Sequence, residues 1–284
     1  MKIYRGVLTG YNEAFIIDTE TRNRILANCR TEEERKRTEE IIKPVLRGRD
    51  IEKWRYNWAG LWLIKIESGW TNKNRGKVKP EEFFKKMFPS IYQHLISFAN
   101  KEIEDRRKGL LNRDDQGDYW WELRDCDYYP EFEKEKIVWQ HVSGRYPFAY
   151  VSKGIYLNNA LFMITHNRGN TMELKLILAI LNSKLGDYLL MTFSRLSTIG
   201  KYAYGAKDAI EKIPIHPITP QNQHIVKKIE SLVSQILSLT QSSDYETNQQ
   251  KQAKVKALER QIDHLVYKLY NLTEEEIKII EGEI

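Results

Sequence analysis

The sequence predicts a mixed α/β fold (α+β): a sheet-rich region built around one long buried helix, followed by an antiparallel helical hairpin. Residues 136–165 alternate strand-like apolar pieces with turns, and residues 172–193 form one long apolar run. Beyond residue 218, apolar side chains recur every three or four positions in two stripes joined by a polar linker. We therefore divide the chain into residues 1–217 and residues 218–284.

The N-terminal part is predicted to begin with two short strands, residues 4–8 and 14–17, on either side of a turn at Gly10. Residues 31–42 carry the pattern of a charged, exposed helix that ends near Pro44. Residues 60–66 are expected to form a strand.

A polar, basic loop is predicted at residues 71–77. From residue 81 the apolar period becomes helical, which predicts one helix over residues 81–98. Four strand-like pieces then follow, KIVWQHV, PFAYV, IYLNN and LFMIT, and the short turns between them predict an antiparallel meander.

Asn170 and Glu173 are spaced as an N-cap, which begins the long buried helix. A loop over residues 195–207 leads to a short extended stretch, residues 212–216. Thr219 with Pro220 predicts the N-cap of the first hairpin helix. The two stripes of the hairpin are Ile225, Ile229, Leu232 and Ile236, then Val255, Leu258, Ile262, Leu265 and Leu269. Thr273 and Glu276 cap a last short helix.

Composition limits the function classes without selecting one. The chain has 284 residues, a formal net charge of +6 and an isoelectric point near 9.0. This excess fits a nucleic-acid-binding protein, but many other proteins carry as much. The two cysteines show no CxxC spacing, the N-terminus has no signal-peptide pattern, and no apolar run reaches the ~18 residues that cross a bilayer. We expect a cytoplasmic protein with no membrane partner.

Motifs that would indicate an active site are missing from the sequence. It has no glycine-rich phosphate loop and no Asn/Asp-Pro-Pro-aromatic tetrad. Glu173 with Lys175 and Glu276 with Lys278 have the E-x-K spacing of restriction-type nucleases, but both pairs fall on predicted helices rather than strands. The six histidines show no close ligand spacing. We predict no catalytic residue and no metal site in this chain.

Six segments in fixed order carry a family resemblance: GVLTGYNEAFIIDTET, IIKPVLRGRDIEKW, EKEKIVWQHVS, GIYLNNALFMIT, LKLILAILNSKLGDYL and IEKIPIHPITPQNQ. Together they resemble the TaqI-like C-terminal specificity domain. This is the target recognition region of type IIG restriction-modification enzymes and related adenine-N6 DNA methyltransferases. The closing ERQIDHLVYKLYNLTEEEIKIIEG is similar to the C-terminal helical tail of the same enzymes, and IPIHPITPQNQHIV also resembles the segment before the spacer helix of type I specificity subunits.

The resemblance implies a non-catalytic module that recognises a specific double-stranded DNA sequence. It would position an S-adenosylmethionine-dependent adenine methyltransferase, and possibly a nuclease, that is supplied in cis or in trans. S-adenosylmethionine and Mg²⁺ would belong to those catalytic parts, so we expect no cofactor in this chain. Because Met1 lies just before the first motif, we expect either a piece of a longer enzyme or a separately encoded subunit. The alternatives are a protein-docking module with minor DNA contact and a degenerate nuclease.

Phosphate contacts are predicted for basic residues beside glycines, helix ends and strand ends. They are Arg47, Arg49, Lys53, Arg106, Arg107, Lys108, Arg168, Lys201 and Lys207. Two alternatives stay open. Arg47 or Arg49 could instead pair with Asp50 or Glu52, and the cluster at 106–108, together with Arg113, is also what a helix C-terminus favours.

Base reading is predicted for two polar loops, because asparagine suits adenine and arginine suits guanine in the major groove. The candidates are Asn72, Lys73, Asn74, Arg75, Lys77, Arg195, Tyr202 and Tyr204. The alternatives are that residues 71–77 form a flexible exposed turn and that the tyrosines pack against the sheet. We expect the basic loops to converge on one concave cationic surface.

Overall fold

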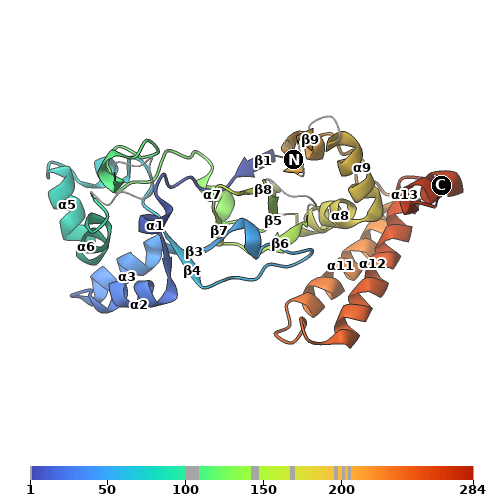
Figure 1. The fold of residues 1–284 in the computed structure, drawn as a ribbon, viewed down its shortest axis with the longest axis horizontal. Coiled ribbons are helices and arrows are strands. Elements are labelled where there is room, and N and C mark those ends of the chain that lie inside the picture. The colour runs from blue at the N-terminus through green and yellow to red at the C-terminus, as the bar shows by residue number, and fades with distance from the viewer. Residues whose placement is uncertain are drawn as a thin grey trace.

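The computed structural model describes residues 2–99, 109–141, 147–166, 170–194, 198–199, 202–203 and 206–283. The molecule is elongated, with N-terminal helices at one end, strands in the middle and C-terminal helices at the other end (Figure 1). This architecture confirms the predicted mixed α/β class.

The first sheet has four antiparallel strands in the order β1 (Lys2–Arg5), β8 (Leu161–Thr165), β5 (Lys136–Gln140) and β6 (Ala149–Val151). Successive strand residues point to opposite faces, and here both faces are apolar. Val138 and Met163 belong to a core shared with the N-terminal helices, whereas Ile137 and Ile164 belong to a core shared with the C-terminal helices. The sheet therefore separates two hydrophobic cores.

The second sheet has the order β2 (Ile16–Asp18), β4 (Leu61–Ile64), β3 (Ile42–Leu46) and β7 (Tyr156–Leu157). Its β7 strand pairs in parallel with β3. The four-strand meander predicted for residues 136–165 is therefore wrong, because its third strand joins the other sheet. There Tyr156 is fully buried and its ring stacks on Phe132 at 4.8 Å between centroids.

Six helices pack around the second sheet at the N-terminal end of the molecule. They are α1 (Asn12–Phe15), α2 (Thr19–Ala27), α3 (Glu32–Ile41), α4 (Trp70–Asn74), α5 (Pro80–Met87) and α6 (Pro89–Ile96). The strand predicted at 14–17 begins two residues later, at Ile16, because α1 occupies its first residues. The helix predicted over 81–98 is broken at Phe88, since Pro89 drives the preceding residue out of the helical region, here to φ −136° and ψ 63°. Shorter helical turns lie at η1 (Gly48–Asp50), η3 (Leu110–Asn112) and α7 (Tyr129–Phe132).

The predicted long buried helix is two helices, α8 (Thr171–Asn182) and α9 (Lys184–Ser194), bent by 67°. Asn170 caps α8 as predicted, accepting a hydrogen bond from the Glu173 backbone N–H. The chain turns at Ser183, whose backbone is extended. Among the described residues, no single helix is long and apolar enough to cross a membrane; only this bent pair passes that test, and only when its two helices are taken together.

The loop predicted at 195–207 contains the small hairpin of β9 (Thr198–Ile199) and β10 (Tyr202–Ala203), and α10 (Ala206–Glu211) follows it. The C-terminal helices are α11 (Gln223–Thr240), α12 (Gln249–Leu269) and α13 (Glu274–Glu281). The predicted hairpin of α11 and α12 is confirmed, and so is the cap of α13 by Thr273 and Glu276. The first hairpin helix begins later than predicted, at Gln223, because residues 220–222 form a turn.

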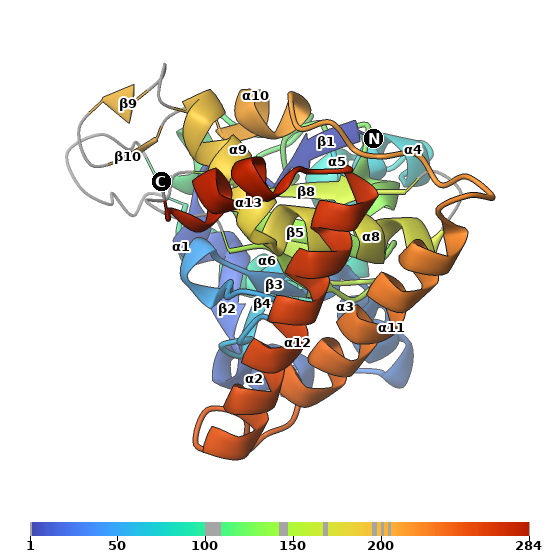
Figure 2. The same cartoon turned by 90° about the vertical axis from the view of Figure 1, so that its right-hand side faces the viewer.

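The hairpin packs on α8, so the second core contains side chains from both sides of residue 217. Figure 2 shows α11 and α12 crossing in front of the sheets and of α8. The division at residues 217 and 218 stays a prediction.

Candidate nucleic-acid interface

Residues 71–74 belong to a short helix, α4, and a buried carboxylate accepts hydrogen bonds from its first turn. Glu122 is fully buried, and its oxygens accept hydrogen bonds from the backbone N–H groups of Gly69, Thr71 and Asp118 at 3.1, 2.8 and 3.0 Å. The Trp121 indole N–H also donates to Thr71 Oγ1 at 2.9 Å. Backbone donors at the start of a helix need such partners, and here a distant residue supplies them. We call α4 with the turn to Lys77 the α4 platform.

Two predicted base readers on the α4 platform are engaged within it. The Asn72 amide donates to Asp118 Oδ2 at 2.7 Å, and its oxygen accepts from Tyr119 at 2.7 Å and from Arg75 Nε at 2.9 Å. Arg75 also donates to the Val78 carbonyl at 3.0 Å. These two side chains therefore stabilise the platform.

The remaining candidates on the α4 platform are exposed. Lys73 and Lys77 have no ion pair or hydrogen bond to any residue that the structure describes. Asn74 uses its amide N–H to bind the Trp70 carbonyl at 2.7 Å, which leaves its side-chain oxygen exposed. The platform thus presents two cations and one amide oxygen.

The two arginines around Gly48 have different environments. Arg47 forms a two-pronged contact with the buried carboxylate of Asp50, through Nη2 at 2.9 Å and Nε at 3.2 Å, and its backbone N–H binds the same group. Arg49 is exposed and has no partner among the described side chains. The structure thus agrees with the alternative of an internal pair for Arg47, while Arg49 is free to meet a ligand.

Lys53, predicted to bind phosphate, forms an ion pair with Glu259 of α12 at 2.8 Å. Glu259 also accepts a hydrogen bond at 2.7 Å from the indole N–H of Trp54, whose backbone φ is 74°. The half-exposed ammonium of Lys53 therefore has a carboxylate partner, and its first role is to attach this segment to α12.

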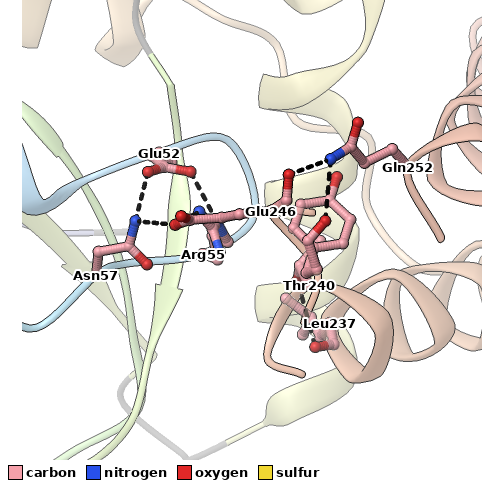
Figure 3. A network of polar contacts seen from close by, with 8 residues as sticks. Glu52, Arg55, Asn57, Leu237, Thr240, Glu246 and Gln252 are labelled. Atoms are coloured by element: carbon pink, nitrogen blue, oxygen red, sulfur yellow. Dashed lines mark hydrogen bonds and ion pairs between the residues drawn. The ribbon is translucent and has the colours of Figure 1, made fainter. Parts of the chain in front are cut away.

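Next to it, Arg55 joins the segment to the connection between α11 and α12 (Figure 3). Arg55 binds Glu52 at 2.7 Å and Glu246 at 2.6 Å, and the Asn57 amide donates to the same two carboxylates. Burial lowers the pKa of Arg55, but these two carboxylates outweigh it and raise the pKa above its ordinary value. We call this group of four residues the hairpin latch. No residue pattern in the sequence indicated it, because Glu246 lies about 190 positions from Arg55 and Asn57.

Arg113, which we grouped with the basic cluster at 106–108, belongs to the interior. It is 6% exposed, and its guanidinium donates to the backbone carbonyls of Thr9, Asp115, Leu110, Trp120 and Glu122. Burial lowers the pKa of Arg113 to about 10. A surface role for this residue is therefore wrong.

The other candidates are placed as follows. Lys207 lies exposed on α10, with Glu211 at 3.7 Å. The backbone of Tyr202 lies in β10. Outside the described residues lie Arg106, Arg107, Lys108, Arg168, Arg195, Lys201 and Tyr204.

The candidate groups lie far apart in the molecule. The α4 platform packs against α5, at one end in Figure 1, whereas β9 lies near the middle of the molecule in that view. Figure 2 also shows α4 and β9 on opposite sides. The expected convergence on one concave surface does not hold for these two elements. A duplex that contacted both would have to extend along the molecule.

The two E-x-K pairs lie on helices α8 and α13, as predicted. Glu173 lies 2.7 Å from His166, and Lys175 lies 2.6 Å from Glu230. Within the described part of the chain, no group of three or more His, Cys, Asp or Glu residues is arranged to hold a metal ion.

Comparison with known proteins gives a family and a fold. The model of the TaqI-like C-terminal specificity domain matches residues 43–215. Among solved structures, the type IIL restriction-modification enzyme MmeI in complex with DNA is similar, with a TM-score of 0.56 and 13% identity. The match covers 96% of this chain and 33% of the MmeI chain, so this chain spans about a third of that enzyme's length. No curated protein matches the chain.

Proposed function

Because the chain belongs to the TaqI-like C-terminal specificity domain family, we propose that it recognises a specific sequence in double-stranded DNA for a restriction-modification enzyme. The family match is the observation that carries this proposal, since it covers most of the chain and names a specificity domain. The MmeI structure supports it at the level of the fold.

The α4 platform supports base reading, because a site that reads sequence must hold its side chains in place before the ligand arrives. Glu122, Asn72 and Arg75 supply that rigidity, and Lys73, Asn74 and Lys77 are the groups presented. Lysine and asparagine suit guanine and adenine edges respectively. Arg49 is proposed as a phosphate contact, because it is exposed and has no partner among the residues that the structure describes.

Methylation and cleavage would be performed by domains or subunits outside this chain. An adenine methyltransferase that uses S-adenosylmethionine is the proposed partner, and a Mg²⁺-dependent nuclease is the second. This chain would then contribute sequence choice and no chemistry.

A variant of the α4 platform tests the proposal. Replacing Lys73, Asn74 and Lys77 with alanine should change the preferred sequence more than it lowers affinity for non-specific duplex. The measurement is selection from a random duplex library, followed by binding titrations on the old and new consensus. The matched control replaces Lys227, Lys228 and Lys256, three exposed lysines of the hairpin, with alanine. An unchanged consensus in the α4 variant would refute base reading by this platform.

A docking module with minor DNA contact is the second candidate. One observation favours it: Met191 and Tyr188 on α9 are 60% and 40% exposed, and α9 packs beside α13. A mobility-shift assay on mixed duplexes, with and without a methyltransferase subunit, separates the two functions. Duplex binding by this chain alone supports recognition, and binding only in the presence of the subunit supports docking.

A further inference from the structure

A cavity of about 850 Å³ opens between two pairs of helices at the N-terminal end of the molecule. One wall is the junction of α2 and α3, with Arg30 and Arg37. The other is the junction of α5 and α6, with Lys85 and Lys86. We call this cavity the N-terminal cleft. The sequence did not indicate any of these four residues as a candidate, because the two arginines lie about 50 positions before the two lysines.

Part of the positive charge of the cleft has no carboxylate partner among the described residues, although the charge of Arg37 acts on Glu33, four residues before it on α3. The side chains of Arg30 and Lys86 have no ion pair or hydrogen bond within the described chain. Arg37 donates one long hydrogen bond to the Met87 carbonyl at 3.5 Å, and its buried Nε has no acceptor. Buried guanidinium nitrogens normally find an acceptor, so the Nε–H of Arg37 is a donor available to a bound anion. Of the four cations, Lys85 has a carboxylate partner, Glu81 at 3.2 Å.

The single carboxylate that lines the cleft is already occupied. Glu34 is 4% exposed and accepts from the Arg30 backbone N–H at 2.9 Å and from Ser90 Oγ at 2.9 Å. Burial raises the pKa of Glu34, but these hydrogen bonds outweigh burial and hold its pKa below the ordinary value. Glu34 thus stays ionised and joins α3 to α6, and none of the four cations forms an ion pair with it.

The remaining lining favours a phosphate ester over other anions. Asn28, Thr31 and Gln93 add amides and a hydroxyl to the cations. Arginine, lysine, hydroxyl and amide groups are the side chains that bind phosphate and sugar oxygens in protein–DNA complexes. The aromatic residue of the lining, Tyr92, is 8% exposed and lies beneath Lys85, 4.6 Å from its ammonium, so the cleft offers little surface on which a base could stack.

We propose that the N-terminal cleft binds backbone phosphate of the recognised nucleic acid through Arg30, Arg37 and Lys86. This inference rests on the proposed function. The chain runs from the α4 platform into the start of α5, and Lys85 and Lys86 lie in the last turn of that helix. Eight helical residues span about 12 Å, close to the width of the DNA major groove. A duplex lying along α5 would meet base readers on α4 and a phosphate clamp in the cleft.

The test compares R30Q/R37Q/K86Q with K227Q/K228Q/K254Q, which removes the same charge from exposed lysines of the hairpin. Affinity for a non-specific duplex is measured as a function of salt. Each lost phosphate contact lowers the log–log slope by about 0.9, so the cleft variant should lose roughly two to three. The hairpin variant should keep its slope. The charge-retaining variant R30K/R37K/K86R should keep most of it, which separates lost charge from lost folding. Circular dichroism and thermal melting establish that each variant is folded.

Direct contact is read from the Nε–H resonance of Arg37 in the full chain. It should shift on addition of duplex, and more weakly with pyrophosphate. An unshifted resonance, equal loss of slope in the cleft and hairpin variants, or tighter binding of ATP than of duplex would overturn the inference. The salt slope could stay unchanged in the cleft variant, and the Arg37 resonance could stay unshifted by duplex, while the protein still selects a DNA sequence. In that case the cleft assignment fails and the proposed function stands. If the unmodified protein binds no duplex, both fail.

Discussion

Two arginines separated by one glycine illustrate how single residues divide between folding and binding. Arg47 neutralises the buried carboxylate of Asp50, which is 4% exposed, whereas Arg49 has no partner within the described part of the chain. Replacing Arg47 with alanine should lower the free energy of unfolding by about 1–3 kcal/mol, because it leaves a buried carboxylate poorly satisfied. Arg49→Ala should change it by less than about 0.5 kcal/mol. It should also lower the salt slope of duplex binding by about 0.9.

Urea unfolding and salt-dependent binding measure the two effects separately. A stable Arg47→Ala protein with weakened DNA binding would contradict this division of roles. So would an Arg49→Ala protein that unfolds easily.

Lys136 is fully buried in β5, where its ammonium donates to the Ser152 carbonyl at 3.0 Å. Burial lowers the pKa of Lys136 to about 7, against 10.5 for the free side chain. The unfolded chain thus binds more protons than the folded chain between these two values, so stability rises with pH in this window. The gain should be at most about 2 kcal/mol between pH 7 and pH 8.5.

Lys136→Met should abolish that rise, and the measurement is urea unfolding at several pH values. The matched control is Lys153→Met, at an exposed turn, which should keep it. His94 does not complicate the window, because burial lowers its pKa below 6.5. The buried tyrosines do not either, since burial raises their pKa above 10. A flat profile in the unmodified protein would show that Lys136 is neutral or solvated throughout.

At the scale of the element, α4 depends on one side chain outside it. A five-residue helix is too short to be stable alone, and Glu122 supplies acceptors to its first N–H groups. Glu122→Gln replaces an oxygen that accepts by a nitrogen that donates. It should cost about 1–3 kcal/mol and loosen the platform. Hydrogen exchange at Thr71 and Asp118 should accelerate.

The control for this change is Glu82→Gln, an exposed carboxylate on α5 whose contact with Lys79 is 3.7 Å long. It should shift the free energy of unfolding by less than about 0.5 kcal/mol. If the proposed function holds, Glu122→Gln should also reduce the difference in affinity between the preferred DNA sequence and other sequences, although it removes no DNA-facing group. Unchanged exchange at Thr71 would show that α4 does not need this carboxylate.

Other elements show how distant contacts redirect local patterns. The apolar run over 172–193 predicted one helix, but the structure bends it at Ser183. A side chain on Gly186 would lie 2.1 Å from the Ile180 carbonyl, so the close approach at this corner requires glycine. Asp263 of α12 accepts from the backbone N–H of Lys184 at the start of α9. The hairpin therefore fixes where the second helix begins.

At the scale of the whole molecule, the first sheet lies between two cores, and α11 and α12 cover α8 in the second one. Removing residues 218–284 would expose α8, whose residues from Leu176 to Asn182 are all buried in the complete chain. The shortened chain 1–217 should therefore melt without cooperativity and bind a hydrophobic dye. Scanning calorimetry measures this, with removal of residues 273–284 as the control, because α13 has no buried residue. A cooperative transition for 1–217 would show that the hairpin is an independent unit.

The hairpin latch and the pair of Lys53 with Glu259 add polar contacts across the same boundary. They use basic residues from a segment that we expected to face DNA. The sequence shows where Lys53 and Arg55 stand, but it does not show which carboxylates they contact. Those carboxylates, Glu259 and Glu246, lie about 200 residues away.

Periodicity, caps and breakers determined much of the fold. The hairpin stripes, the Asn170 cap, the α13 capping box and β4 depend on residues within a few positions of each other, so they were readable without coordinates. The family was readable for a related reason, since its motifs keep a fixed order along the chain. Tertiary contacts alone decided which basic residues are free. Arg113 and Arg49 are each followed by an aspartate, yet among the described residues Arg113 binds five carbonyls and Arg49 binds none. Burial and charge pairing are properties of positions in space, and those positions are set by pairings between segments that a local pattern does not encode.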